Sequence, residues 1–263
     1  MKSELLSQIE GIPEFELVDV FVREGVFKKQ EHFRGVVERG ESEAVAMVSD
    51  KYNLVQIREL FRNAVDCCGE NVEGDVLYYG GKGDLIIFPE GNSVGLIVQN
   101  SVDLSSAVRI SFCSKVRNGD VLRIPAEIVA PFVRIHTARD IRVQIDHYLK
   151  LLEQVKPAWE QIVASLAKLE LTREDIEKLK KDIRAGKRLG EIIDEYLPDP
   201  SQETFAPVKF WDFVQVVMRA ISRCRRRYRS EFHLSRKIRK VGDVILEWAV
   251  FEKLRISSLS AAK

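Results

Sequence analysis

The chain has 263 residues, of which 45% are hydrophobic and 31% are charged, a composition that excludes a disordered protein. Its 41 Lys and Arg residues balance its 40 Asp and Glu residues, so the net charge of +1 indicates no class of partner. No apolar run reaches the roughly 18 residues of a transmembrane helix, and the four cysteines form no regular framework, so we expect no membrane association and a reduced, cytoplasmic protein.

The first third of the chain mixes strand and helix patterns. Alternating apolar residues predict strands, and Ile57, Leu60, Phe61 and Ala64 recur on one stripe of a helix. The expected elements are a helix at 1–10, strands at 15–22, 32–38 and 44–49, and a helix at 56–65.

A β-meander follows, with expected strands at 75–79, 84–89, 94–98 and 107–114. The Gly-Gly-Lys-Gly run at 80–83 invites comparison with a phosphate-binding loop. Such a loop has to open a helix, whereas this run lies between two strands, so we interpret it as a hairpin turn.

The chain becomes helical after residue 130. Thr137, Thr172 and Ser235 are the expected N-caps, and Pro157 is expected to kink or break the long helix that contains it. Further helices are expected at 189–196 and 210–228, and 197–206 is the expected linker, exposed and open to proteolysis. We therefore predict an α+β protein with a mainly antiparallel sheet at 1–130 and a helical region at 131–263.

The strongest charge signal lies at 208–240, which holds eleven Lys and Arg residues and two acids, a local net charge of +9. Arginine forks match the geometry of phosphate, and neighbouring aromatic residues can stack on unpaired bases. The predicted nucleic-acid contacts are Arg219, Arg223, Arg226, Arg227, Arg229, Arg236, Lys237, Arg239 and Lys240.

A structural alternative is that these cations pair with the acids of the helices at 170–196 in an internal seam. Like charges three or four residues apart repel each other, so some anion is needed, and it can be internal or external.

Catalytic chemistry has weak support. His136 and Asp140 are four residues apart, but His147 is too far along a helix to join the same ion, so we predict no metal site and no cofactor. Cys113 and Cys224 are expected to be buried apolar residues. An enzyme is the least favoured interpretation, with a site built from Asp103, Arg109, His136 and Asp140.

Several stretches resemble, in the same order, the phage/plasmid-like protein family (domain of unknown function 932). They read VSDKYNLVQ at 48–56, NSVDLSSAVRISF at 100–112, IHTARD at 135–140 and FWDFVQVVMRAISR at 210–223. The resemblance implies the biology of phages, viruses or plasmids and carries no established activity.

Together these features predict a nucleic-acid-binding protein of a mobile element, with single-stranded DNA favoured, acting in replication or recombination. The alternative is an interaction protein that binds a host protein to evade its defences. Homo-oligomerisation stays open. A second polar contact site is expected at Asn100, Asp103, Ser105, Ser106, Arg109 and His136, in which we expect a buried Arg109 to pair with Asp103.

Overall fold

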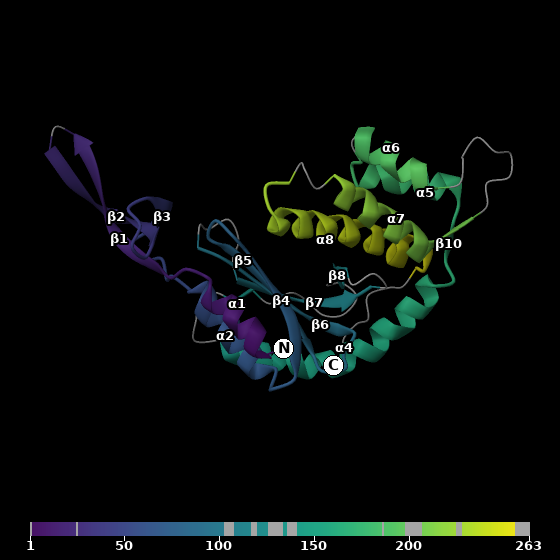
Figure 1. The fold of residues 1–263 in the computed structure, drawn as a ribbon, viewed down its shortest axis with the longest axis horizontal. Helices are drawn as coiled ribbons and strands as arrows, with labels where there is room; N and C mark the ends of the chain where they lie inside the picture. The colour runs from purple at the N-terminus through teal and green to yellow at the C-terminus, as the bar shows by residue number, and fades with distance from the viewer. Residues whose placement is uncertain are drawn as a thin grey trace. The chain divides into compact units, whose positions relative to one another are not determined.

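The computed structural model describes residues 2–24, 26–102, 108–116, 120–125, 134–135, 141–185, 187–197, 207–224 and 228–255. The chain divides into two compact units, one formed by Met1–Ser111 and Phe132–Leu152, the other by Phe112–Pro131 and Glu153–Lys263. Antiparallel sheets dominate the N-terminal part and helices the C-terminal part, so the α+β prediction is confirmed (Figure 1). The division differs from the single boundary expected near residue 130, because the chain passes between the units three times.

Two sheets and two helices form most of the first unit. One sheet has the order β1-β2-β3 and the other contains β4-β5-β6-β7, with β9 paired to β7. The bounds are α1 Lys2–Glu10, β1 Phe15–Glu24, β2 Val26–Glu38, β3 Ala44–Ser49, α2 Ile57–Cys67, β4 Val72–Tyr79, β5 Lys82–Pro89, β6 Val94–Ser101, β7 Val108–Lys115 and β9 Arg134–Ile135.

The hairpin between β4 and β5 turns through Gly80 and Gly81, whose φ angles are +53° and +77°. Glycine adopts such angles without steric cost, so the predicted hairpin is confirmed. On β5, Gly83 faces α2: a Cβ atom there would lie 2.7 Å from Ile57 Cγ2 and 2.9 Å from Phe61 Cζ. The absence of a side chain therefore allows α2 to pack closely on this sheet.

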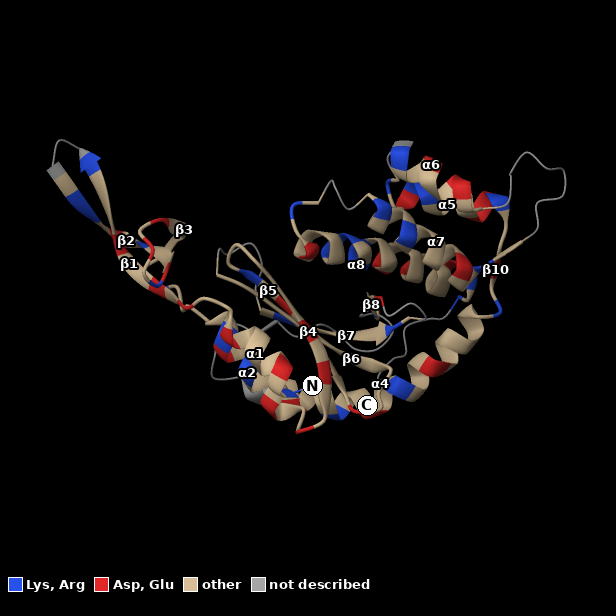
Figure 2. Ribbon diagram, in the orientation of Figure 1, with Lys and Arg blue, Asp and Glu red and all other residues tan. Residues whose placement is uncertain are grey.

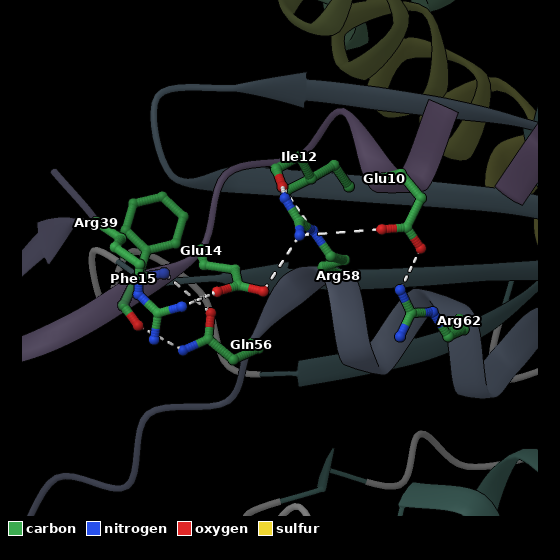
Figure 3. A network of polar contacts seen from close by, with 8 residues as sticks. All are labelled: Glu10, Ile12, Glu14, Phe15, Arg39, Gln56, Arg58 and Arg62. Atoms are coloured by element: carbon green, nitrogen blue, oxygen red, sulfur yellow. Dashed lines mark hydrogen bonds and ion pairs between the residues drawn. The ribbon is translucent and has the colours of Figure 1, made fainter. Parts of the chain in front are cut away.

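A polar network holds the start of the β1-β2-β3 sheet to α1 and α2 (Figure 3). Arg58 of α2 donates from Nε to the Ile12 carbonyl at 2.8 Å and from Nη1 to Glu14 at 3.2 Å. The amide of Gln56 bonds both backbone groups of Phe15, accepting from its N–H at 3.0 Å and donating to its carbonyl at 2.6 Å. These contacts fix where the three-stranded sheet begins.

The second unit contains β8 Val121–Arg123, β10 Glu170–Leu171, α5 Arg173–Asp182, α6 Lys187–Tyr196, β11 Val208–Lys209, α7 Phe210–Arg223, α8 Glu231–Glu247 and the π-helix η3 Trp248–Lys253. Helix α4, Ile141–Leu166, begins in the first unit and ends in the second. β8 pairs with the last residues of β7, and β10 pairs with β11. On α8, Gly242 packs against Leu122 of β8.

Thr172 caps α5 through a capping box with Asp175, as predicted. Ser230, not Ser235, caps α8, because Ser235 lies inside that helix and its hydroxyl accepts a bond from Arg239. Helix α4 continues through Pro157, so the expected break is absent. A proline removes only one helical hydrogen bond, and the buried side chains on both sides of it support the helix.

Helix α7 ends at Arg223, five residues before the predicted end at 228. All four cysteines are free, and Cys113 and Cys224 are buried as expected. The helix cap expected at Thr137, and the linker beyond Leu197, lie outside the described residues.

Candidate functional site

Helix α7 presents the clearest candidate surface of the second unit. Its apolar side chains follow a helical stripe and are buried, among them Phe210, Phe213, Val217 and Ile221. The predicted contact residues Arg219 and Arg223 lie on the other side of the helix and are exposed. They are one turn apart, about 6 Å along the axis, so both can reach one extended ligand.

An open hollow of about 440 Å³ lies beside these arginines. This volume falls within the range of about 300–1,000 Å³ that is typical of small-molecule sites. Tyr196, at the end of α6, and Asp120, just before β8, supply the lining from the other elements. The lining residues are Asp120, Tyr196, Met218, Arg219, Ser222 and Arg223.

Arg223 already interacts with two residues of α6. Its guanidinium lies over the Tyr196 ring, 4.7 Å from the ring centroid, and its Nη1 atom is 3.4 Å from Glu195 Oε2. This ion pair is one contact of the kind expected for an internal seam. Both of its side chains are more than half exposed, so the pair contributes about 0–1 kcal/mol and can be exchanged for another anion.

Arg219 differs from Arg223 in its partners. Within the described part of the chain, no acid lies within ion-pair distance of Arg219. Asp120 is the acid that shares the hollow with it, and burial raises the pKa of that carboxyl above its usual value. Protonation of Asp120 would therefore leave the hollow more positive.

Helix α5 and helix α6 carry interspersed cations and acids, as does α8 (Figure 2). Several of these charges are paired within the unit: Lys180 of α5 contacts Asp194 of α6 at 2.8 Å, and Lys178 pairs with Glu252 of η3. Lys180 also pairs with Glu177, and Lys253 pairs with Asp175, so several acids of α5 and α6 already have a lysine partner.

The predicted cations of α8 divide into exposed and buried residues. Lys240 is exposed, whereas Lys237 is half-buried, and burial together with the charge of Lys240 lowers the pKa of Lys237. Arg236 is half-buried and lies over the Phe232 ring, 4.4 Å from its centroid. Arg239 is only 1% exposed and donates from Nη1 to Ser235 Oγ at 3.0 Å, so it cannot contribute to an open surface in this conformation.

The remaining predicted cations come after the end of α7 in the chain. Arg229 is exposed, and Arg226 and Arg227 lie outside the described residues. The structure therefore brings together Arg219 and Arg223, with Tyr196 and Asp120 as neighbours that the sequence did not single out. Neither neighbour belongs to a motif, so only the folding of α6 and of the segment before β8 reveals them.

In the second predicted polar site, Asn100 has a structural role. Asn100 is 3% exposed and donates from Nδ2 to the Val55 carbonyl at 3.0 Å, which ties β6 to the segment that precedes α2. Arg109 is half-buried on β7. The other proposed members, Asp103, Ser105, Ser106 and His136, lie outside the described residues, as does the expected pairing of Asp103 with Arg109.

Among the residues that the structure describes, no group of three His, Cys, Asp or Glu side chains is arranged to hold a metal ion. Within the same residues, no helix has the length and apolar character needed to cross a membrane.

Comparison with known protein families, curated proteins and solved structures found no match to this chain. The resemblance to the phage/plasmid-like family therefore stays a prediction.

Proposed function

We propose that the protein binds nucleic acid, with single-stranded DNA preferred, through the hollow beside α7. The observation that carries this proposal is the pairing of two exposed arginines one helical turn apart with an aromatic ring in an open hollow of about 440 Å³. Guanidinium groups bind phosphate oxygens through parallel hydrogen bonds, and Ser222 adds a hydroxyl to the same lining.

The preference for a single strand follows from the lining. An unpaired base can leave its neighbours and stack on a guanidinium or on an aromatic ring, as Arg223 and Tyr196 already stack on each other. A base inside a duplex cannot enter such a hollow without being unpaired. Replication or recombination of a mobile element is the setting that the family resemblance implies for this activity.

The weak pair between Arg223 and Glu195 is compatible with the proposal. A phosphate can replace the exposed carboxylate at little cost, because both groups remain hydrated. The pair would then keep Arg223 oriented while no ligand is bound.

The test is fluorescence anisotropy with labelled single- and double-stranded DNA over a series of salt concentrations. The wild type should bind the single strand more tightly, and log K should fall with log salt by about 0.7 for each phosphate contacted. The double variant Arg219→Gln/Arg223→Gln should remain folded, because Gln is nearly as good a helix former as Arg. Its affinity should fall on all sequences, with a slope smaller by about 1.4 if each arginine holds one phosphate.

A matched control is Lys168→Gln/Lys181→Gln, which removes the same charge from exposed positions of the same unit that do not line the hollow. This variant should retain the wild-type slope. The proposal fails if the wild type shows no salt-dependent binding, or if the control loses as much affinity as the arginine variant.

A further inference from the structure

The three-stranded sheet β1-β2-β3 exposes an unusual amount of apolar surface. Seven large apolar side chains are exposed among the described residues, and six of them belong to this sheet. Single exposed apolar residues are common, but apolar residues that share one face mark an interaction surface, and Phe33 and Met47 share a face of this sheet. The six are Phe21, Val22, Phe27, Phe33, Val45 and Met47, which are 40–72% exposed.

The two faces of this sheet differ in exposure. Val36 and Val48 point to one face and are 0% and 2% exposed, so that face is covered within the unit. On the other face Met47 is opposite Gly35, and Phe33 lies two residues from that glycine on the same strand. Phe33 and Met47 are 48% and 56% exposed, so this face is open there, although Val37 on the same face of β2 is 4% exposed.

The two edges of the sheet differ in charge. β1 forms one edge and contains Glu16, Asp19, Arg23 and Glu24. β3 forms the other edge and reads AVAMVS, with no ionisable residue and no proline. Proteins usually protect an exposed edge strand with charges or prolines, because its free N–H and C=O groups can pair with another strand. β3 lacks this protection.

We infer that the edge strand β3 pairs with β3 of a second copy of this chain, in an antiparallel arrangement about a two-fold axis. In such a pairing each residue meets a residue of the same segment, so a charge near the centre would meet a like charge. An uncharged strand avoids this repulsion. The pairing would join two three-stranded sheets and place the open faces with Phe33 and Met47 beside each other.

The charges of the sheet favour a second copy of this chain, and not a nucleic acid, as the partner of β3. β3 offers no cation, and on the neighbouring strands Asp19 already pairs with Lys29 at 2.5 Å and lies 3.7 Å from Arg34. The network around Arg58 and Gln56 holds the start of β1, the first strand of this sheet, in place (Figure 3). This inference does not depend on the proposed nucleic-acid binding.

Analytical ultracentrifugation of the full chain over a range of concentrations tests the inference. A six-residue edge with a small apolar face is a modest interface, so the dimer should appear as the concentration rises through the micromolar range. Met47→Lys, a change at an exposed position of the edge, should raise the midpoint of dimerisation at least tenfold. Phe27→Lys is the matched control, because Phe27 is 72% exposed but lies on β2 near the hairpin end, and it should leave the midpoint unchanged.

Hydrogen exchange of the wild type gives a second measurement that needs no variant. Amides of Ala44–Ser49 that point away from β2 should exchange more slowly at high protein concentration than at low concentration. A monomer at every concentration, or a dimer in which the exchange of this segment does not change, would overturn the inference. A dimer that Phe27→Lys disrupts and Met47→Lys leaves intact would assign the interface to the hairpin instead.

Discussion

Asp120 is the single residue whose charge most directly opposes the proposed function. Its carboxylate lines the hollow with Arg219 and Arg223, so the ionised form repels a phosphate there. Burial raises its pKa, so acidification protonates it earlier than an ordinary aspartate. We predict that Asp120→Asn binds single-stranded DNA more tightly than the wild type at pH 7, by a few-fold.

The sign of the pH dependence distinguishes this effect from a change in folding. As the pH falls through the pKa of Asp120, the wild type loses the repulsive charge and its affinity should approach that of the Asn variant. All other ionisable groups are shared by the two proteins, so the ratio of the two dissociation constants isolates Asp120. Equal affinities at pH 7, or a ratio that stays constant down to the ordinary aspartate pKa of about 3.9, would remove Asp120 from the site.

For other single residues, helical periodicity predicted correctly in some cases, and not in others, whether the side chain is exposed. Arg219 and Arg223 are opposite the buried stripe of α7, so their exposure followed from the spacing. Arg239 directly follows the buried Ile238 on α8, at the border of the apolar stripe, and pattern alone cannot decide whether such a residue is buried. Asn100 looked like a ligand-binding residue, but its partner is the carbonyl of Val55, which is distant in sequence.

At the level of elements, two helical glycines provide a matched pair in one unit. A Cβ atom at Gly242 would lie 2.5 Å from Cδ2 of Leu122, which is 1% exposed and has little room to move. A Cβ atom at Gly190 of α6 would meet nothing closer than Lys180 Cε at 4.0 Å. Both changes to alanine gain helix propensity, worth up to about 1 kcal/mol.

We therefore predict opposite effects on stability. Gly190→Ala should raise the free energy of unfolding by about 0.5–1 kcal/mol. Gly242→Ala should lower it by about 1 kcal/mol, because overpacking costs about 1–3 kcal/mol and exceeds the gain in propensity. Urea unfolding followed by tryptophan fluorescence measures both, since Trp159, Trp211 and Trp248 all belong to this unit. If both variants are stabilised, α8 does not pack closely on β8.

Most predicted helices and strands are present where the hydrophobic periodicity and the turn residues indicated the same element. β3 has the predicted bounds, and α2 begins one residue after the predicted start, because alternation and a helical stripe are local signals. The predicted end of α7 and the predicted start of α8 were wrong. The apolar pattern that predicted helix as far as Tyr228 does not record where the backbone leaves the helix, and Ser230 and Ser235 are equally good caps by residue type.

For the whole molecule, the division into two units was the least predictable feature. The sequence suggested one boundary where strand patterns give way to helical ones. One of the three boundaries, after Pro131, lies next to the predicted one, whereas the other two lie inside β7 and inside α4, which are continuous as local patterns. The unit to which a residue belongs depends on contacts between segments that are far apart in the sequence, and no local pattern indicates such contacts.

The last prediction combines the two proposed surfaces, since the hollow and the β3 edge belong to different units. If both proposals hold, a dimer carries two DNA sites, and a strand long enough to reach both binds the second site intramolecularly. An oligonucleotide of about 10 nucleotides should occupy one site, because single-strand sites commonly span about 4–16 nucleotides.

We expect the wild type and Met47→Lys to bind the short oligonucleotide equally, because the variant leaves the hollow intact. On strands of increasing length up to about 60 nucleotides, the wild type at concentrations that favour the dimer should gain at least about tenfold in affinity over the variant. Arg219→Gln/Arg223→Gln should still dimerise but bind neither length well. A length dependence that Met47→Lys retains in full would mean that each protomer engages long strands alone, because avidity requires two linked sites.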